Sequence, residues 1–145
     1  MSKRRQAREY ALQILYQIEQ SGLELNDVIP LFWNDLHVEP EIREFAERLV
    51  KGVCERRDEI DKKLAAHSEH WKLDRMTRID KSLLRLAVFE MFWCEDIPEK
   101  VTINEAVDLG KIYGTEDSGA FINGVLDSLL KEKGAERKKD EVGYN

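Results

Sequence analysis

The sequence predicts an all-α protein that forms a single domain of about seven helices. Apolar residues recur at steps of three and four along almost the whole chain, and no segment shows the sustained apolar–polar alternation of a strand. The Asn123-Gly124 pair lies inside a helical pattern and not between two strand-like runs. With 145 residues, 42% of them hydrophobic, the chain is long enough to bury a core.

Three helices are predicted in the first half of the chain. The first covers about residues 3–19, where apolar side chains form one stripe. The second is predicted to begin near Asn26-Asp27, because Pro30 fits only the first turn of a helix. The third opens at Pro40, a favoured first helical position, and continues to Leu64 with a bend or break near Gly52.

Thr77 is predicted to begin the helix at the centre of the core. Asp80 follows three residues later, as in a capping box, and the apolar residues from there to Cys94 occupy more than one face. A second capping-box pattern, Thr102-Ile-Asn-Glu105, is predicted to open a helix that Gly114 closes. A helix that is apolar on several faces must be surrounded by others, which places the first of these two at the centre.

The last major helix is predicted to be capped by Asp117 or Ser118 and to end at Gly134. The residues that follow are highly charged and nearly free of apolar side chains, which is typical of a frayed terminus. The predicted organisation is therefore a helical domain over residues 1–132 and a charged tail over residues 133–145.

This acidic chain begins with a basic stretch. The first sixteen residues, MSKRRQAREYALQILY, carry a net charge of +3, from Lys3, Arg4, Arg5 and Arg8 against Glu9. Because the whole chain carries −6, the other residues together carry −9, the difference between −6 and +3. Any binding of nucleic acid must therefore come from a local basic patch on a surface that otherwise repels it.

The arginines of this stretch are predicted to lie on one exposed helical strip. Arg5, Arg8, Leu12 and Tyr16 fall at steps of three and four, away from the apolar stripe. Positive charge at a helix N-terminus opposes the macrodipole by ~0.3–1 kcal/mol, so the arrangement predicts an anionic ligand. Nucleic acid is the favoured interpretation. A solvated basic helix start and an acidic membrane surface remain alternatives.

No catalytic motif is present: the chain has no GxSxG, P-loop, GxGxxG or HExxH pattern, so neither enzyme activity nor a cofactor is predicted. His67 and His70 have only Glu69 as a nearby third ligand, which favours surface histidines over a metal site. Cys54 and Cys94 are predicted to be buried free thiols. Without a signal-peptide pattern or an apolar run of about 20 residues, the protein is predicted to be cytoplasmic and not membrane-bound.

Two segments of the second half carry a family resemblance. IDKSLLRLAVFEM and IPEKVTINEAVDLGKIYGTEDSGAFINGVLD resemble the signature of the NusB family of bacterial transcription antitermination factors, and the RRQAREYALQILY opening resembles that family's N-terminus. The resemblance implies a fold of two packed helical bundles. It also implies binding of boxA-type single-stranded RNA together with the ribosomal protein NusE, within an RNA polymerase complex that resists termination, notably on ribosomal RNA operons.

The resemblance further implies two groups of site residues. The RNA-binding group is Arg4, Arg5, Arg8, Arg85 and Phe121, and the partner-binding group is Tyr16 and Asp80. From the residues alone, Phe121 is equally well interpreted as a core aromatic, and Asp80 as the capping acid of its helix. Two other functions stay open: a helical protein–protein adaptor with incidental RNA contacts, and an accessory RNA-binding domain of a system that modifies ribosomal RNA. A homodimer of the free protein is left open as well.

Overall fold

The computed structural model describes residues 2–67 and 76–143, with side chains placed through Arg137. These residues form seven α-helices and no strand, which confirms the all-α prediction. The helices are α1 (Lys3–Ser21), α2 (Leu25–Trp33), α3 (Pro40–Glu55), α4 (Arg57–His67), α5 (Arg78–Trp93), α6 (Glu99–Tyr113) and α7 (Ser118–Gly143). The predicted metal alternative involving His70 lies outside the described residues.

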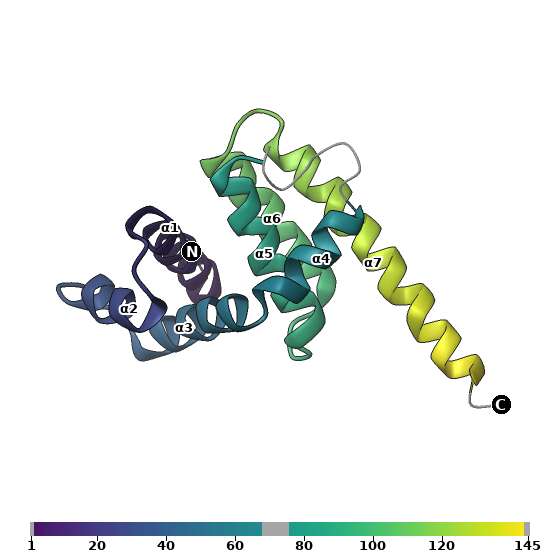
Figure 1. The fold of residues 1–145 in the computed structure, drawn as a ribbon, viewed down its shortest axis with the longest axis horizontal. Coiled ribbons are helices and arrows are strands. Elements are labelled where there is room, and N and C mark those ends of the chain that lie inside the picture. Colours follow the sequence, from purple (N-terminus) through teal and green to yellow (C-terminus); the bar gives the residue numbers. More distant parts are fainter. Residues whose placement is uncertain (1, 68–75, 144–145) are drawn as a thin grey trace.

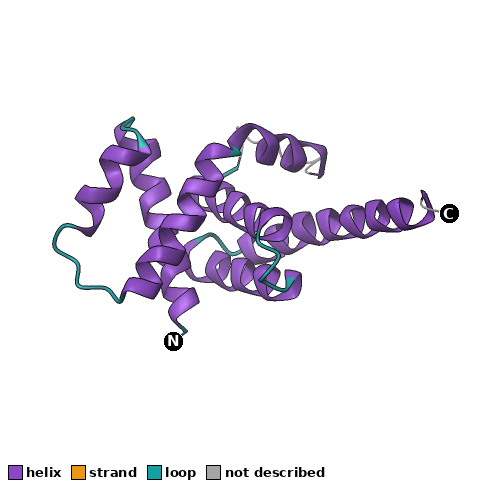
Figure 2. Cartoon of the chain, turned by 90° about the horizontal axis from the view of Figure 1, so that it is seen from below, coloured by secondary structure: helices purple, strands orange, loops and turns teal. Residues whose placement is uncertain are grey.

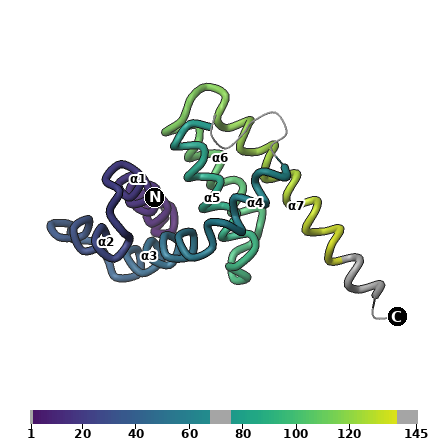
Figure 3. The backbone as a smooth tube through the Cα atoms, in the orientation of Figure 1, coloured from purple at the N-terminus to yellow at the C-terminus, as the bar shows by residue number. Residues whose placement is uncertain are grey.

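The helices form two groups that meet along α5. Figure 1 shows α1, α2 and α3 together at one end and α4 to α7 at the other, while α1 and α3 both pack against α5. Figure 3 follows the chain from the first group through α4 into the second. Helix α5 is buried almost throughout from Asp80 to Met91, so the prediction that it lies at the centre is confirmed.

Local signals begin and end several helices where the sequence predicts. The Thr77 hydroxyl accepts a hydrogen bond from the backbone N–H of Asp80 at 3.1 Å, so Thr77 caps α5. The Ser2 hydroxyl does the same for α1 through the N–H of Arg5 at 3.0 Å. Gly22 ends α1 with a φ of 70°, in the left-handed region that glycine adopts without strain. Gly114 follows the last residue of α6, as predicted.

Two predicted positions in the first half are wrong. Pro30 lies inside α2 and not in its first turn, because Glu24 precedes the helix and its carbonyl accepts the N–H groups of Asp27 and Val28. The predicted break in the long third helix is present, but it lies at Arg56, four residues after Gly52. The Gly52 carbonyl accepts the N–H of Arg56, which ends α3. Gly52 itself lies within the helix. Because it has no side chain, the ring of Phe89 can pack against it.

Other predicted boundaries in the second half are also wrong. Helix α6 begins at Glu99 directly after Pro98, so Thr102 lies inside the helix, where its side chain is buried against α5. Helix α7 continues past Gly134 to Gly143 and projects from the body of the molecule in both views (Figure 1 and Figure 2). Lys133 and Arg137 both donate to Glu99 at 2.7 Å, so residues assigned to the tail contact the domain.

The two cysteines differ from the prediction in one respect. Both are free, but only Cys94 is buried, and Cys54 is exposed. Burial raises the pKa of the Cys94 thiol to about 11, and partial desolvation of the sulfur by neighbouring atoms is the main cause that raises the pKa of Cys54. Both thiols therefore remain protonated near neutral pH, a state that disfavours nucleophilic chemistry.

Candidate nucleic-acid and partner interface

Arg8 does not lie on an exposed strip, so the prediction of its orientation is wrong. Its side chain is 5% exposed and forms a bidentate pair with Glu90 of α5, with N–O distances of 2.9 and 2.7 Å. The Thr102 hydroxyl donates to the same carboxylate at 2.9 Å. Helix α1 packs against both α3 and α5, so it buries two faces instead of one stripe. Arg8 therefore joins three helices, α1, α5 and α6, through a single buried carboxylate.

Arg5 is partly buried and held by acids of another helix. Its guanidinium contacts Glu105 and, at 2.9 Å, Asp108, both from α6, and its side chain is 21% exposed. The acids of α6 therefore supply the negative charge that the N-terminal turn of α1 lacks. The unfavourable charge at this helix start is offset within the fold, and an external anion is not required to explain it.

Arg4 is the most exposed of the three N-terminal arginines. Its guanidinium lies 4.7 Å from the centre of the Phe45 ring and 3.4 Å from Asp96, which follows α5. Arg48 of α3 donates to both oxygens of the same carboxylate at 2.8 and 3.2 Å. The Arg48 hydrogen bond lowers the pKa of Asp96 to about 2, so this acid stays charged at neutral pH. Nothing in the sequence pattern distinguishes Arg48 from Arg43 on the same helix.

Arg85 is buried and paired with two acids. It donates to both oxygens of Asp61 at 2.8 and 3.0 Å and to Glu19 at 3.1 Å, and its side chain is 8% exposed. These contacts connect α5 with α4 and α1. The guanidinium has no exposed side that RNA could contact, so in this structure Arg85 stabilises the packing of the helices.

Phe121 and Asp80 both lie partly or wholly inside the protein. Phe121, near the start of α7, is half-buried and packs against the core. Asp80 is 7% exposed, and its Oδ1 atom is buried without a hydrogen-bond partner among the described residues. A buried carboxylate oxygen without a partner costs free energy.

Tyr16 lies on the surface between two hollows. It is 44% exposed. One hollow, of about 320 Å³, is lined by Leu12, Ile79 and Tyr113 beside it, and Ile79 directly precedes Asp80 in α5. A second hollow, of about 300 Å³, runs along α1 and α2. The structure therefore brings the two predicted partner-binding positions to the same region, where α1 meets the start of α5.

Tyr113 borders the first hollow and is fixed by a contact with α1. Its hydroxyl donates a hydrogen bond to Glu9, and that bond is the main cause that raises the pKa of Tyr113. No sequence motif linked these residues, because they are 104 positions apart. The hollow thus combines an apolar floor with exposed aromatic rings, an arrangement suited to a protein partner.

Other kinds of site receive no support from the described part of the chain. Among the side chains that the structure describes, in residues 2–67 and 76–137, no three from His, Cys, Asp or Glu gather in a way that could hold a metal ion. None of the described helices is long and apolar enough to cross a membrane.

The amino-acid sequence is similar to those of one known protein family. A model of the NusB family matches residues 5–131. The chain is 48% identical over 141 residues to the transcription antitermination protein NusB of Syntrophus aciditrophicus, covering 97% of this chain and 86% of that protein. It is 50% identical over 129 residues to the NusB protein of Anaeromyxobacter dehalogenans, covering 88% of this chain and 90% of that protein.

Solved structures of similar proteins share the fold. T. maritima NusB matches with a TM-score of 0.81 at 36% identity, over 91% of this chain and 93% of the other. A crystal structure of the antitermination factors NusB and NusE in complex with dsRNA contains a chain that matches with a TM-score of 0.80. That chain is 27% identical, and the match covers 91% of this chain and 98% of the other. By its sequence and its fold, this chain belongs to the NusB family.

Proposed function

We propose that this protein is a transcription antitermination factor that binds RNA together with the ribosomal protein NusE. The observation that carries the proposal is the likeness to a NusB chain that forms a complex with NusE and dsRNA and shares this fold over 91% of this chain. The proposed RNA is a boxA-type single strand in a nascent transcript, and the complex acts on RNA polymerase. Such a factor works by binding, without catalysis, in the bacterial cytoplasm where transcripts are made.

The proposed RNA surface begins at the N-terminus of α1. Arg4 and Lys3 are about half-exposed, and Arg5 is partly accessible beside them. Arginine forks match phosphate geometry, and a helix presents them with little loss of conformational entropy. Arg8 and Arg85 support this surface from inside by fixing α1 against α5. Phe121, half-buried at the start of α7, is the proposed aromatic contact for an unstacked base.

The proposed NusE surface centres on Tyr16 and Asp80. Tyr16 is exposed between two hollows, and Asp80 directly follows Ile79, which lines the first of them. Partially buried tyrosines are frequent energetic centres of protein interfaces. An acidic protein also attracts the basic surface that is usual for ribosomal proteins.

A plain protein–protein adaptor is the second candidate. The pairing of Arg5 with two acids of α6 favours it, because those acids reduce the charge that RNA would meet. The two functions differ in one respect. A factor that holds RNA and NusE together couples the two binding events, whereas an adaptor with incidental RNA contacts does not.

We expect Tyr16→Asp to weaken NusE binding by ~30-fold or more, because it places a charge where an aromatic ring packs, a change worth ~2 kcal/mol or more at an interface centre. Isothermal titration of NusE into each variant measures the effect. Leu36→Asp is the matched control: Leu36 is 43% exposed against 44% for Tyr16, and it lines neither hollow. Equal losses for both variants would contradict the proposed surface.

The same titrations test the coupling. RNA should tighten NusE binding by the same factor by which NusE tightens RNA binding, and ~1–3 kcal/mol is the usual range for linked sites. Tyr16→Asp should lower RNA affinity mainly when NusE is present. Binding of the two ligands without any mutual effect would favour the adaptor.

We expect RNA binding to weaken with salt. If three or four phosphates are neutralised, the logarithm of the association constant should fall against the logarithm of salt concentration with a slope of roughly −2 to −3. Fluorescence anisotropy of a labelled single strand from 50 to 300 mM salt would measure the slope. A slope near zero would remove the electrostatic basis of the proposed RNA surface.

A further inference from the structure

Three charged side chains from distant parts of the chain meet at one exposed point. Arg4 of α1 and Arg48 of α3 both contact Asp96, at 3.4 Å for Arg4 and at 2.8 and 3.2 Å for Arg48. The three side chains are 49%, 42% and 48% exposed. This differs from Arg8 and Arg85, whose side chains are nearly inaccessible. Here the guanidinium groups are available to an external ligand.

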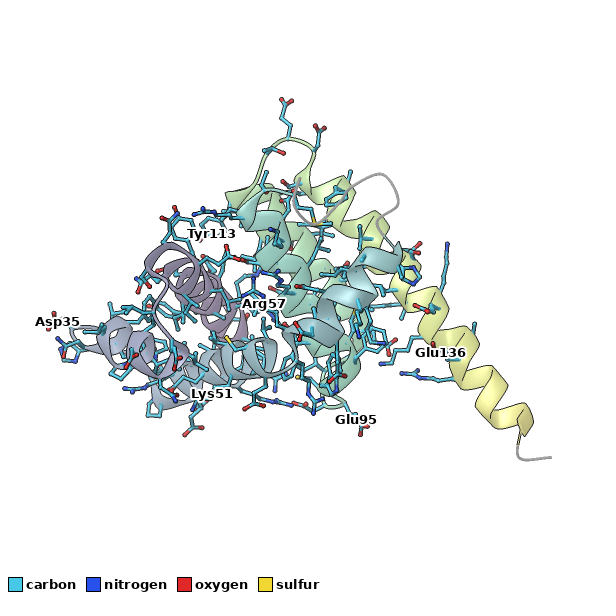
Figure 4. The ribbon with its side chains drawn as sticks, viewed as in Figure 1. Asp35, Lys51, Arg57, Glu95, Tyr113 and Glu136 are labelled. Carbon is cyan, nitrogen blue, oxygen red and sulfur yellow. The ribbon has the colours of Figure 1, made fainter. Side chains whose placement is uncertain are left out.

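Figure 4 labels two residues that lie close in sequence to members of this cluster. Glu95, which precedes Asp96, is labelled at the edge of the molecule where α5 leads to α6, and Lys51 of α3 is labelled along the same edge. An open hollow of about 310 Å³ adjoins the cluster and is lined in part by Lys3, Arg4 and Arg48. The cluster thus faces solvent beside a space large enough for a phosphate group.

The charges of the cluster favour an additional anion. Two guanidinium groups share one carboxylate, which leaves a net charge of +1. Arg48 uses two donors on Asp96, whereas Arg4 makes one long contact and keeps most of its five N–H donors available. Glu41 and Glu44 also line the hollow and repel an anion, so the favourable position is the space between the two guanidinium groups.

Asp96 has the chemistry of a substitute for phosphate. A guanidinium fork binds a carboxylate and a phosphate through the same pair of parallel N–H···O bonds. Arg43, on the same helix as Arg48, instead pairs with Glu47 one turn away, an ordinary surface pair. Arg48 reaches across to another element and meets the acid that also holds Arg4, the proposed RNA-binding residue.

We propose that Arg4 and Arg48 form one clamp for an RNA phosphate, and that Asp96 occupies this clamp when RNA is absent. Asp96 holds the two side chains in position in the free protein and opposes the phosphate when RNA arrives. The clamp rests on the proposed RNA-binding function, to which it adds a binding residue, Arg48, and a residue that limits affinity, Asp96.

The test uses the full chain, NusE and a labelled boxA-type single strand at fixed salt. Arg48→Gln should weaken RNA binding by about tenfold, as expected for loss of a charge-assisted phosphate contact, and should make the salt slope shallower by ~0.7. The control Arg43→Gln removes the same charge from the same helix at 48% exposure and should change affinity by less than about twofold.

The second pair of variants tests Asp96. Asp96→Asn should tighten RNA binding by about threefold or more, because it removes the competing charge but keeps the side-chain shape. Glu95→Gln removes an exposed charge at the adjacent position and should tighten binding less. In the wild type, the Nε–H signals of Arg4 and Arg48 should both shift in NMR spectra when RNA is added.

The outcomes separate the two proposals. If the wild type does not bind RNA even with NusE, the proposed function fails and the clamp falls with it. If the wild type binds and Arg4→Gln weakens binding, but Arg48→Gln equals Arg43→Gln, the clamp alone is wrong. Weaker RNA binding by Asp96→Asn would also overturn the clamp, because Asp96 would then assist RNA instead of competing with it.

Discussion

Glu90→Leu should destabilise the protein by about 3–5 kcal/mol, because it removes the bidentate partner of the buried Arg8 guanidinium and leaves only Glu105, at 3.8 Å, as a counter-charge. Arg8 and Glu90 are 5% and 2% exposed, so water cannot replace the lost partner. The Thr102 hydroxyl loses its acceptor as well. Urea unfolding followed by circular dichroism measures the change in the free energy of unfolding.

The double variant Arg8→Met with Glu90→Leu provides the decisive control. Replacing both members of a buried pair by apolar residues of similar volume is often nearly neutral, so most of the lost stability should return. Arg43→Met breaks an exposed pair within α3 and should cost at most ~0.5 kcal/mol. If Glu90→Leu costs no more than Arg43→Met, the buried pair does not hold the helices together.

This expectation changes how Arg8 variants are interpreted in RNA-binding assays. On an exposed strip, Arg8→Ala would remove a phosphate contact and leave the fold intact. In the observed position the same change leaves Glu90 buried without its arginine partner. Any loss of RNA binding would then come from destabilisation of the fold and not from a lost phosphate contact. Arg4→Gln tests RNA contact more directly, because Arg4 is half-exposed.

Gly52→Ala should destabilise the protein by about 3 kcal/mol, at the upper end of what overpacking a core costs. A methyl group at Gly52 would overlap the ring of Phe89, which packs directly on the backbone of α3. Phe89 is 7% exposed and stacks on Trp93 with an interplanar angle of 16°, so its ring has little room to move away. Thermal and urea unfolding both report the loss.

Two companion variants isolate the steric cause. Gly124→Ala in α7 meets no atom within 4 Å, so the better helix propensity of alanine should stabilise the protein by about 0.5–1 kcal/mol. Adding Phe89→Leu to Gly52→Ala should recover part of the loss by removing the ring. Equal effects of alanine at Gly52 and Gly124 would rule out the close approach of α3 and α5.

The sequence pattern predicts the parts of this fold that depend on local chemistry. Thr77 caps α5, and the apolar residues of that helix on several faces place it at the centre, because such a helix must be surrounded. Helix ends were less predictable. Pro30 is tolerated inside α2, whose Val28 and Ile29 are buried, and glycine at position 134 does not stop α7. In both cases the stability of the rest of the helix exceeds the cost of one residue with low helix propensity.

The candidate site was predictable in composition but not in geometry. Tyr16 is exposed near the start of α5, as its helical spacing predicted. Arg8 lies on a buried face of α1, where its charge is matched by Glu90. The sequence pattern could not predict this position, because Glu90 is 82 residues away. The role of Arg48 could not be predicted for the same reason. Its partner Asp96 is 48 residues away, and periodicity along one helix carries no information about such pairs.

The long separation between the arginines of α1 and their acids has a consequence for synthesis. Glu90 and Glu105 are added 82 and 100 residues after Arg8 and Arg5. At 5–20 residues per second, this delay is about 4–20 s. During that interval the nascent N-terminal segment carries its net positive charge next to ribosomal RNA, without the acids that pair with Arg5 and Arg8 in the folded protein. Only when α5 and α6 emerge can the chain withdraw Arg8 from the surrounding polyanion and bury it.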